Sequence, residues 1–322
     1  QSVINAGSYD VSAGTVTPPD LSCVCTTQLT NMSSLFSVKQ SFNDNISNWD
    51  VSNVTNMNNM FNNALAFNQD ISSWDVSNVN NMQQMFENAR SFNQNIDVWD
   101  VSSVTNMISM FKNASQFNQP IASAPNRWNV SNVQYFSSFL KDATSFNQPF
   151  EWGGADGTVS AINMWGMFRS NSLNSPITLN TNNVTNMETM FEDATAFNSA
   201  LNFSNTSNVT KMNFMFKNAR AFNQPLNFNT SSVIGMREMF NHARSFNQNI
   251  YNWYVSNVIN FRATFAHAYE FNQPLNNWVT TCAVSMQSMF MNARKFNQLL
   301  TNFDTQNVNN MSSMFHSALV FN

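Results

Sequence analysis

The sequence has little charge, little glycine and few cysteines: its 322 residues include 14 Lys and Arg, 18 Asp and Glu, 7 Gly and 3 Cys. A net charge of -4, without any run of Lys or Arg, lacks the basic surface that nucleic acids and anionic membranes require, so neither partner is expected. No segment approaches the roughly 20 apolar residues of a membrane span, so we expect no membrane insertion. The start at Gln1 lacks the regions of a signal peptide, which indicates a mature or excised chain.

Catalytic motifs are absent as well. The sequence contains no Gly-rich phosphate loop, no Cys-x-x-Cys pair, no Gly-x-Ser-x-Gly elbow and no pair of acids set apart from the repeated pattern. Catalysis needs groups that differ from their surroundings, whereas nearly every polar residue here recurs at a fixed interval. We therefore expect a protein that is not an enzyme, with no catalytic residues and no cofactor.

Asparagine, phenylalanine and methionine are in excess, with 57, 30 and 20 residues. Asparagine-rich segments can be disordered, but the apolar residues here recur at fixed intervals, which indicates an ordered repeat. A Phe-Asn step returns every 24 to 29 residues, and Leu173-Asn174 fills the one gap. The steps begin at Phe42, Phe67, Phe92, Phe117, Phe146, Phe197, Phe222, Phe246, Phe271, Phe296 and Phe321.

Residues 49–74 show one repeat unit. From Met57 to Phe67 the apolar residues are spaced as on one face of a short helix, which Asn56 or Thr55 would cap. Val51 and Val54 lie in a short β-prone stretch before it. A helix of two turns or a single strand is unstable alone, so the units must stack. The sequence therefore predicts an α/β repeat solenoid of about twelve turns, each with short parallel strands and a short helix.

Stacking places equivalent side chains about 4.8 Å apart, so like residues form columns. The asparagine of the Phe-Asn step is expected to be structural, because an amide can donate and accept at once and stacked amides do not repel one another. The repeated Met and Phe residues are expected to fill the core rather than to hold a cofactor.

The unit Trp49-Asp-Val-Ser-Asn-Val-Thr-Asn-Met57, continued by Met60-Phe61, Ala64 and Phe67-Asn-Gln-Asp-Ile71, resembles the repeat of BspA-like leucine-rich-repeat surface proteins. The resemblance covers roughly residues 30–322. It implies a leucine-rich-repeat-like solenoid, an extracellular or cell-surface location, and roles in adhesion or surface architecture. Residues 136–139, Leu173 and residues 261–264 depart from the pattern but largely keep its apolar volume.

Two regions follow from this pattern: an N-terminal segment, residues 1–29, and the repeat solenoid, residues 30–322. The sequence ends in mid-unit at Phe321-Asn322, and Gln1-Ser-Val-Ile4 continues the motif where it stops. We therefore expect copies to join head to tail, unless the chain is a fragment of a longer repeat protein. The residues expected at this subunit joint are Gln1, Val3, Ile4, Tyr9, Val11, Phe315, Phe321 and Asn322.

Three insertions interrupt the rhythm at residues 13–28, 122–127 and 153–160, and we expect them to project from one edge. Cys282 lies too many turns from Cys23 and Cys25 for a bond within one straight solenoid. Across a head-to-tail joint, a disulfide from Cys282 to Cys23 or Cys25 becomes conceivable. A buried free thiol at Cys282 is the alternative.

Possible sites outside the core are few. His242 and His267 share one phase in successive units but lack a third ligand, and Asp50, Asp75 and Asp100 form a short column. We interpret all five as turn residues, so no metal is expected. Candidate N-glycosylation sites, expected if the source is eukaryotic, are Asn31, Asn45, Asn53, Asn113, Asn129, Asn183, Asn202, Asn205, Asn208, Asn229 and Asn310, with the group from Asn202 to Asn208 foremost.

The favoured function is an extracellular structural protein that assembles head to tail into a filament, sheath or flagellar hair. The alternative is a surface adhesin that recognises a protein or glycan without polymerising. In a variant of that alternative, exposed aromatics such as Trp128 or Trp152 bind carbohydrate.

Overall fold

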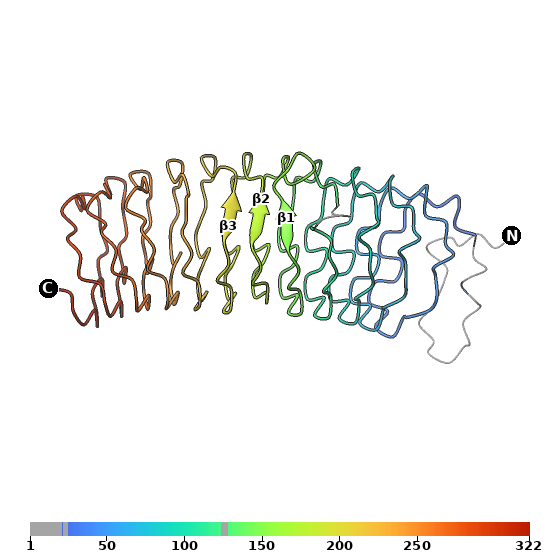
Figure 1. Cartoon of the computed structure of the whole chain (residues 1–322), viewed down its shortest axis with the longest axis horizontal. Helices are drawn as coiled ribbons and strands as arrows, with labels where there is room; N and C mark the ends of the chain where they lie inside the picture. The colour runs from blue at the N-terminus through green and yellow to red at the C-terminus, as the bar shows by residue number, and fades with distance from the viewer. Residues whose placement is uncertain (1–20, 22–24, 124–127) are drawn as a thin grey trace. The chain divides into compact units, whose positions relative to one another are not determined.

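The structure is a computed structural model that describes residue 21 and residues 25–123 and 128–322. It divides into two compact units, unit 1 from Gln1 to Ser160 and unit 2 from Ala161 to Asn322. In both, the chain winds through a series of stacked coils (Figure 1). No helical segment of the described part is long and apolar enough to cross a membrane.

Within each unit, successive coils touch at the residue before the repeated methionine or the phenylalanine that replaces it. Isolated parallel bridges join these residues at intervals of about 25, for example Asn56 to Asn81 and Asn81 to Asn106. Among the described residues, five in unit 1 and seven in unit 2 are bridged in this way, which agrees with the prediction of about twelve turns. They are Asn31, Asn56, Asn81, Asn106 and Tyr135, then Asn163, Asn186, Lys211, Gly235, Asn260, Ser285 and Asn310.

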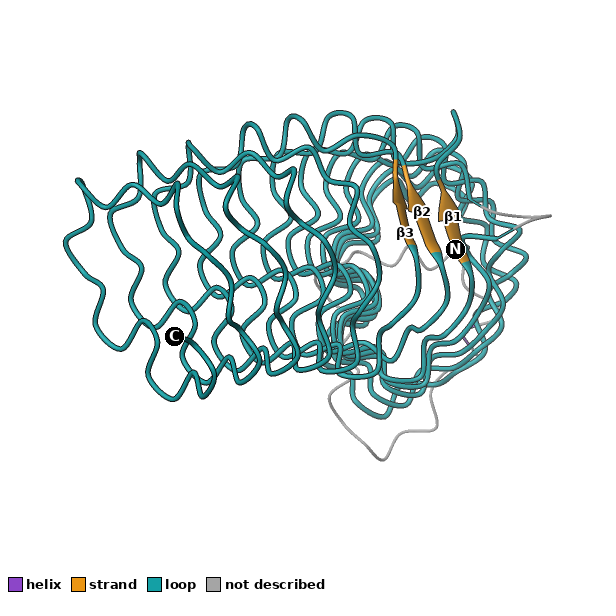
Figure 2. Ribbon diagram, turned by 60° about the vertical axis from the view of Figure 1, so that its left-hand side comes forward, coloured by secondary structure: helices purple, strands orange, loops and turns teal. Residues whose placement is uncertain are grey.

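The described residues contain three strands, each three residues long: β1 (Phe150–Trp152), β2 (Ile177–Leu179) and β3 (Leu201–Phe203). In unit 2, β2 pairs in parallel with β3, with Ile177 opposite Leu201 and Leu179 opposite Phe203. Figure 2 shows how little of the chain these strands occupy. In most other coils the same position is a turn, because two residues instead of one separate the isoleucine or leucine from the aromatic residue that follows.

The predicted helix in each coil is wrong: no helix is present in the described ranges, and a ribbon of β-turns takes its place. In the segment Met57–Ala64, alternate N–H groups bond to different partners. Met57 and Asn59 donate to carbonyls of the next coil at 3.0 and 2.9 Å, whereas Met60 donates within its own coil to Met57 at 3.2 Å. We call this segment and its equivalents the turn ribbon.

Left-handed residues explain why the turn ribbon cannot be helical. Asn59 and Asn63 have φ angles of 57° and 59°, and every later coil repeats both positive angles. A residue at positive φ ends a right-handed helix, and asparagine, aspartate and histidine tolerate this conformation better than most side chains. The predicted apolar face was nonetheless right, because every apolar residue from Met57 to Phe67 that it named is fully buried.

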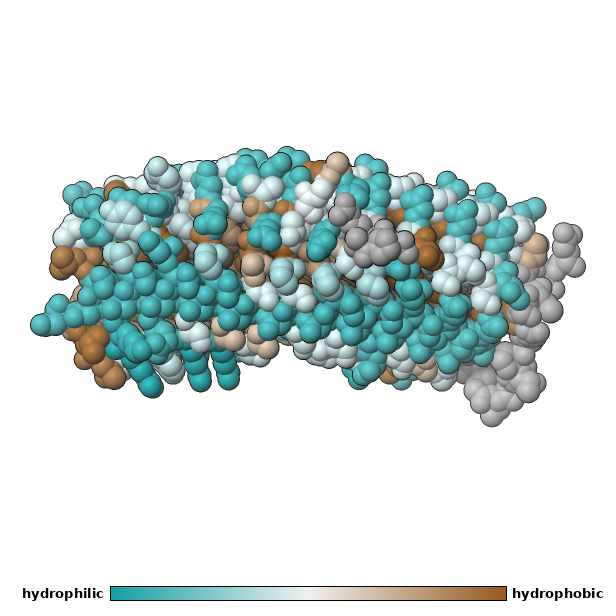
Figure 3. Space-filling view, viewed as in Figure 1, coloured by the Kyte–Doolittle hydropathy of each residue, from teal (hydrophilic) through white to brown (hydrophobic). Residues whose placement is uncertain are grey.

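The core of each unit is made of columns of stacked rings. In unit 1, the rings of Phe61 and Phe86 lie 5.5 Å apart and nearly parallel. In unit 2, Phe240 and Phe265 repeat this arrangement at 5.6 Å. These spacings are those of favourable offset stacking. The visible surface, by contrast, is largely hydrophilic (Figure 3).

The predicted asparagine ladder is confirmed in both units. The Oδ1 atom of Asn68 accepts a hydrogen bond of 2.9 Å from the backbone N–H of Asn93, and Asn93 serves Asn118 in the same way at 2.9 Å. In unit 2, Asn247 accepts from Asn272 at 2.9 Å. Each amide thus satisfies a backbone donor of the next coil, which an apolar side chain could not do.

Candidate functional site

A second set of regular hydrogen bonds between successive coils, which we call the indole ladder, is made by tryptophan side chains. The indole N–H of Trp74 donates to the carbonyl of Ile46 at 3.2 Å, and that of Trp99 donates to Ile71 at 3.1 Å. Trp278 donates to Ile250 at 3.1 Å in unit 2. In each case the acceptor belongs to the preceding coil, so one polar atom per coil is satisfied without water.

The indole ladder is broken at Trp253. This side chain is only 4% exposed, yet no hydrogen-bond acceptor for its Nε1 exists among the described residues. Its expected acceptor is the carbonyl of Leu226, which likewise receives no donor in that part of the chain. Unlike Trp152 Nε1, which is fully buried without a partner in the described part of the chain, Trp253 Nε1 is not fully buried, so solvent or a ligand can reach it.

A missing residue causes the break. In a regular coil the isoleucine carbonyl faces the next indole because a turn closes it, as Trp74 N–H donates to Ile71 at 3.2 Å. In the coil of Leu226, the aromatic residue Phe228 comes two positions later instead of three, so no such turn forms. Residues 226–228 form neither a turn nor a paired strand, and the Leu226 carbonyl accepts no hydrogen bond from a described residue.

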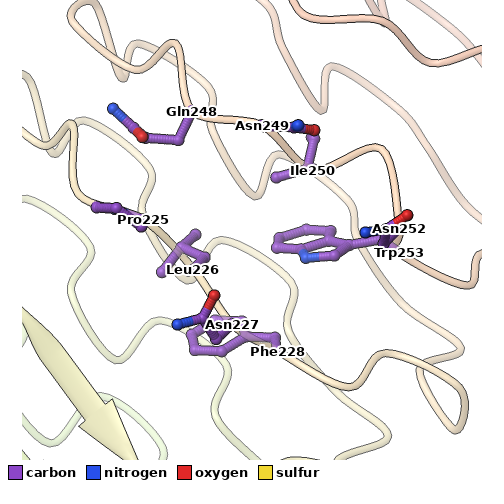
Figure 4. Close-up of a pocket in the computed structure, with 9 residues that line it drawn as sticks. All are labelled: Pro225, Leu226, Asn227, Phe228, Gln248, Asn249, Ile250, Asn252 and Trp253. Atoms are coloured by element: carbon purple, nitrogen blue, oxygen red, sulfur yellow. The ribbon is translucent and has the colours of Figure 1, made fainter.

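A groove lies between the coil that contains Leu226 and the following coil, which contains Trp253. Its volume is about 350 Å³. In Figure 4 the Trp253 ring points toward Leu226 and Phe228, with its nitrogen on the side of these two residues. The Phe228 and Trp253 rings stack at 6.0 Å. The groove is lined by Pro225, Leu226, Asn227, Phe228, Gln248, Asn249, Ile250, Asn252 and Trp253.

The groove is polar but uncharged. Gln248 is anchored, since its Nε2 donates to the carbonyl of Asn223 at 2.9 Å. Asn249 uses its Oδ1 to accept from Tyr251 at 2.9 Å. Asn227 and Asn252 are exposed and bring both donors and acceptors. The arrangement can bind a neutral polar group; it has no acid, base or nucleophile for chemistry on it.

Unit 2 holds nine of the 14 basic residues, and several of them pair with acidic residues on its turn ribbon. Glu192 and Glu238 are the inner members, with side chains 10% exposed. Lys217 bridges them, with its Nζ 3.1 Å from Glu238 and 3.6 Å from Glu192. Arg169 lies 3.1 Å from Glu192. Burial and nearby Asp193 raise the pKa of Glu192 despite these cations.

Glu238 titrates in the opposite direction from Glu192. Burial acts to raise its pKa, but the hydrogen bond and charge of Lys217, together with Asn241 and Arg237, outweigh it and lower the pKa. Glu238 has no acidic neighbour comparable to Asp193, which explains the difference. These ion pairs account for part of the basic surface as structure rather than as a binding site.

The two histidines occupy left-handed positions of the turn ribbon. His242 and His267 have φ angles of 60° and 58°, and their rings stack at 4.1 Å. Burial, His267 and the nearby arginines lower the pKa of His242 to about 4. Within the described ranges, no three His, Cys, Asp or Glu side chains come together as a metal site.

The aspartate column consists of turn residues, as the sequence predicted. Asp50 Oδ1 accepts hydrogen bonds from the Ser52 hydroxyl at 2.6 Å and backbone N–H at 3.0 Å, and these bonds lower its pKa. Asp75 binds Ser77 in the same manner. Asp100 accepts from the backbone of Ser102 at 2.9 Å.

Of the cysteines, Cys25 and Cys282 are exposed and free, so the alternative of a buried Cys282 is wrong. Cys23 lies outside the described residues, and the disulfide between copies stays a prediction. The carbohydrate variant is also wrong as to its residues, because Trp128 and Trp152 are 1% and 0% exposed. The sequence missed Trp253, although the shortened coil before it was visible as a 24-residue interval.

The residues of the proposed subunit joint are only partly described. Gln1, Val3, Ile4, Tyr9 and Val11 lie outside the described residues. Phe315 and Phe321 are half-exposed and stack at 4.0 Å, and Asn322 is exposed. Insertion residues 153–160 fold back in unit 1, where Thr158 N–H donates to the Trp152 carbonyl at 3.0 Å.

The candidate glycosylation sites lie at the surface. Nine are exposed, while Asn113 and Asn310 are half-buried. Two of the exposed ones donate from their amide nitrogen to a backbone carbonyl of the preceding coil: Asn53 Nδ2 donates to Thr27 at 2.8 Å and Asn208 Nδ2 donates to Asn182 at 2.7 Å. A glycan on either would disturb a contact between coils.

Comparison with solved structures gives remote likenesses. One is the TLR13–ssRNA13 complex, with 11% identity, a TM-score of 0.27, and coverage of 84% of this chain and 45% of that one. Another is an internalin (inlF) from Listeria monocytogenes, with 7% identity, a TM-score of 0.19, and coverage of 79% and 80%. This chain thus spans less than half of the first of these proteins, and no argument rests on either. No curated protein matches the chain.

Comparison with protein families is more informative. The family described as "Mycoplasma protein of unknown function, DUF285" matches residues 11–123, 77–155, 154–228 and 226–322. The four overlapping matches agree with a chain built from many copies of one unit. They leave the BspA-like resemblance itself a prediction. Because the matches together span most of the chain, this protein belongs to the DUF285 repeat family.

Proposed function

We propose that this chain is a non-catalytic binding module of an extracellular or cell-surface repeat protein, with an adhesive role. One observation carries the proposal. The repeated Asn and Trp side chains mostly form hydrogen bonds between coils, whereas the groove beside Trp253 contains polar groups that form none. Polar groups that already bond to one another are not available to a ligand. A groove of this size with unpaired polar groups can bind one. The exposed Asn-x-Ser/Thr sites favour an extracellular location.

Adhesion of beads coated with the chain tests this function. Wild-type beads are expected to bind a plate coated with mucin or with fibronectin. Asn252→Trp fills the groove and should abolish binding. Asn48→Trp is the matched control, because Asn48 is exposed at the same position of a coil whose indole ladder is intact. Wild-type beads that bind neither plate, or equal binding by Asn252→Trp, would overturn the proposal.

A second candidate is head-to-tail assembly into a filament, and the last coil favours it. Met311 is 43% exposed, whereas its counterpart Met286 is fully buried. In the inner coils, backbone groups such as Met286 N–H and Phe290 N–H donate to the following coil at 2.9 and 2.8 Å. The same groups of Met311 and Phe315 find no acceptor among the described residues. Such a face can be covered by a further repeat of a longer chain or by a second copy, and we propose that a second copy covers it.

Analytical ultracentrifugation tests this assembly. The wild type is expected to sediment as a concentration-dependent series of species. Met311→Glu should shift that series toward monomer, since it places a charge in the joint. Leu319→Arg should leave it unchanged, because Leu319 lies on the lateral surface of the same coil, where Arg294 stands in the coil before. A wild type that stays a single 36.5 kDa species at all concentrations would exclude assembly.

A further inference from the structure

The groove offers a donor and an acceptor that fail to meet. In every coil where Trp74, Trp99 or Trp278 stands, the indole N–H and the preceding carbonyl lie 3.1 to 3.2 Å apart. At Trp253 no such hydrogen bond forms, and neither group has another hydrogen-bond partner among the described residues. A group that accepts from the indole while donating to the carbonyl can close this gap. A hydroxyl does both at once.

The other residues that line the groove also favour a neutral ligand that both donates and accepts hydrogen bonds. The amides of Asn227, Asn249 and Asn252 supply further donors and acceptors at the rim, and Gln248 is fixed there by Asn223. No ionisable side chain lines the groove, so a charged ligand would lose hydration without gaining a partner. Leu226 and Ile250, both at least 95% buried, provide an apolar floor. A ligand with several hydroxyls and one apolar face satisfies all of these conditions.

We infer that the groove beside Trp253 binds a neutral sugar unit of a glycan. Two features favour it over an added peptide strand. The segment from Leu226 to Phe228 is only three residues long and follows Pro225, which has no backbone N–H. A peptide strand added along it could therefore form very few backbone hydrogen bonds. Each peptide group, moreover, presents its N–H and its C=O in opposite directions, and one alone cannot bridge the open pair. This inference rests on the proposed binding function and names its ligand class.

Nuclear magnetic resonance of the full chain with ¹⁵N-labelled tryptophan tests the inference. The probes are the methyl glycosides of glucose, galactose, mannose and N-acetylglucosamine, each at 50 mM. At least one is expected to shift the indole resonance of Trp253, assigned by its loss in Trp253→Phe. The resonance of Trp278, whose N–H is already bonded, should stay in place. Asn252→Ala is expected to weaken the response at least fivefold.

Three outcomes would overturn the inference: no shift with any glycoside, a shift of equal size at Trp278, or a shift at Trp253 caused only by the control peptide Ac-Ala-Ala-Ala-amide. Hydrogen exchange of the indole N–H provides a separate check, since Trp253 should exchange at least tenfold faster than Trp278. The bead assay stands apart from these measurements. Beads that adhere while no glycoside binds would leave the adhesive function intact and remove the sugar, and the converse would remove adhesion alone.

Discussion

Gly166→Ala distinguishes the turn ribbon from the helix that the sequence pattern suggests, because the two structures predict opposite signs. Gly166 has a φ of 59°. The equivalent positions of other coils carry side chains at the same φ, such as Asn59, Ser109 and Thr189, so the fold accommodates a Cβ there and the variant tests the backbone conformation. In a helix interior, Gly→Ala would stabilise the chain by about 1 kcal/mol. In the turn ribbon, alanine at positive φ should destabilise it by about 1 kcal/mol instead.

Urea unfolding of the wild type and of Gly166→Ala tests this, because the stability changes expected for a helix and for the turn ribbon differ by about 2 kcal/mol. Because stacked repeats need not unfold in one step, hydrogen exchange provides the local readout. The backbone N–H of Gly166 donates to Glu188 at 2.9 Å, and its exchange should rise about fivefold in Gly166→Ala. Asn292→Gly is the counterpart control, since its φ of 56° suits glycine, and it should leave stability unchanged or slightly higher. A stabilising Gly166→Ala would refute the turn ribbon.

Three further predictions concern the ladders and the histidine pair. Trp278→Phe should lower the free energy of unfolding by about 1 kcal/mol, because it removes the bond to Ile250, whereas Trp253→Phe should change it little. Asn93→Ala should cost about 1 kcal/mol, because the N–H of Asn118 loses its acceptor, and Asn93→Asp, which keeps an acceptor, should cost less. Between pH 6.5 and 4 the unfolded chain protonates His242 while the folded chain, with its pKa lowered to about 4, does not, so stability is complete above pH 6.5 and falls as the pH drops.

The measurements for this group are simple. Urea unfolding at pH 7.5 compares the tryptophan and asparagine variants, and equal losses in Trp253→Phe and Trp278→Phe would contradict the broken ladder. For the histidine, the loss between pH 7.5 and pH 4.5 should be about 1 kcal/mol after allowing for solvent screening at this partly exposed site. His242→Asn, which places there the residue found at Asn218, should show a smaller pH dependence; an unchanged dependence would show that another group is responsible.

The sequence by itself determined which residues face the core and how often the chain returns. Equal spacing of Phe61, Phe86 and Phe111 requires that each coil repeat the last, because only stacking can bury such residues in units this short. The same reasoning identified the Asn68 and Asn93 ladder, since a column of amides has few other ways to be satisfied. Asp50 and its equivalents were recognisable as turn residues from the serine two positions later.

Tertiary structure decided the conformation between those fixed points. The spacing from Met57 to Phe67 suits a helix and a ribbon of turns equally well, and the choice depends on whether N–H groups bond within the coil or to the next one. The neighbouring coil supplies hydrogen-bond acceptors, such as the Asn81 carbonyl 3.0 Å from the Met57 N. These bonds offset the conformational cost of the left-handed angles at Asn59 and Asn63. The groove arises in the same way. One residue fewer before Phe228 is a small change in the sequence, but its effect on the Leu226 carbonyl and the Trp253 indole exists only where two coils meet.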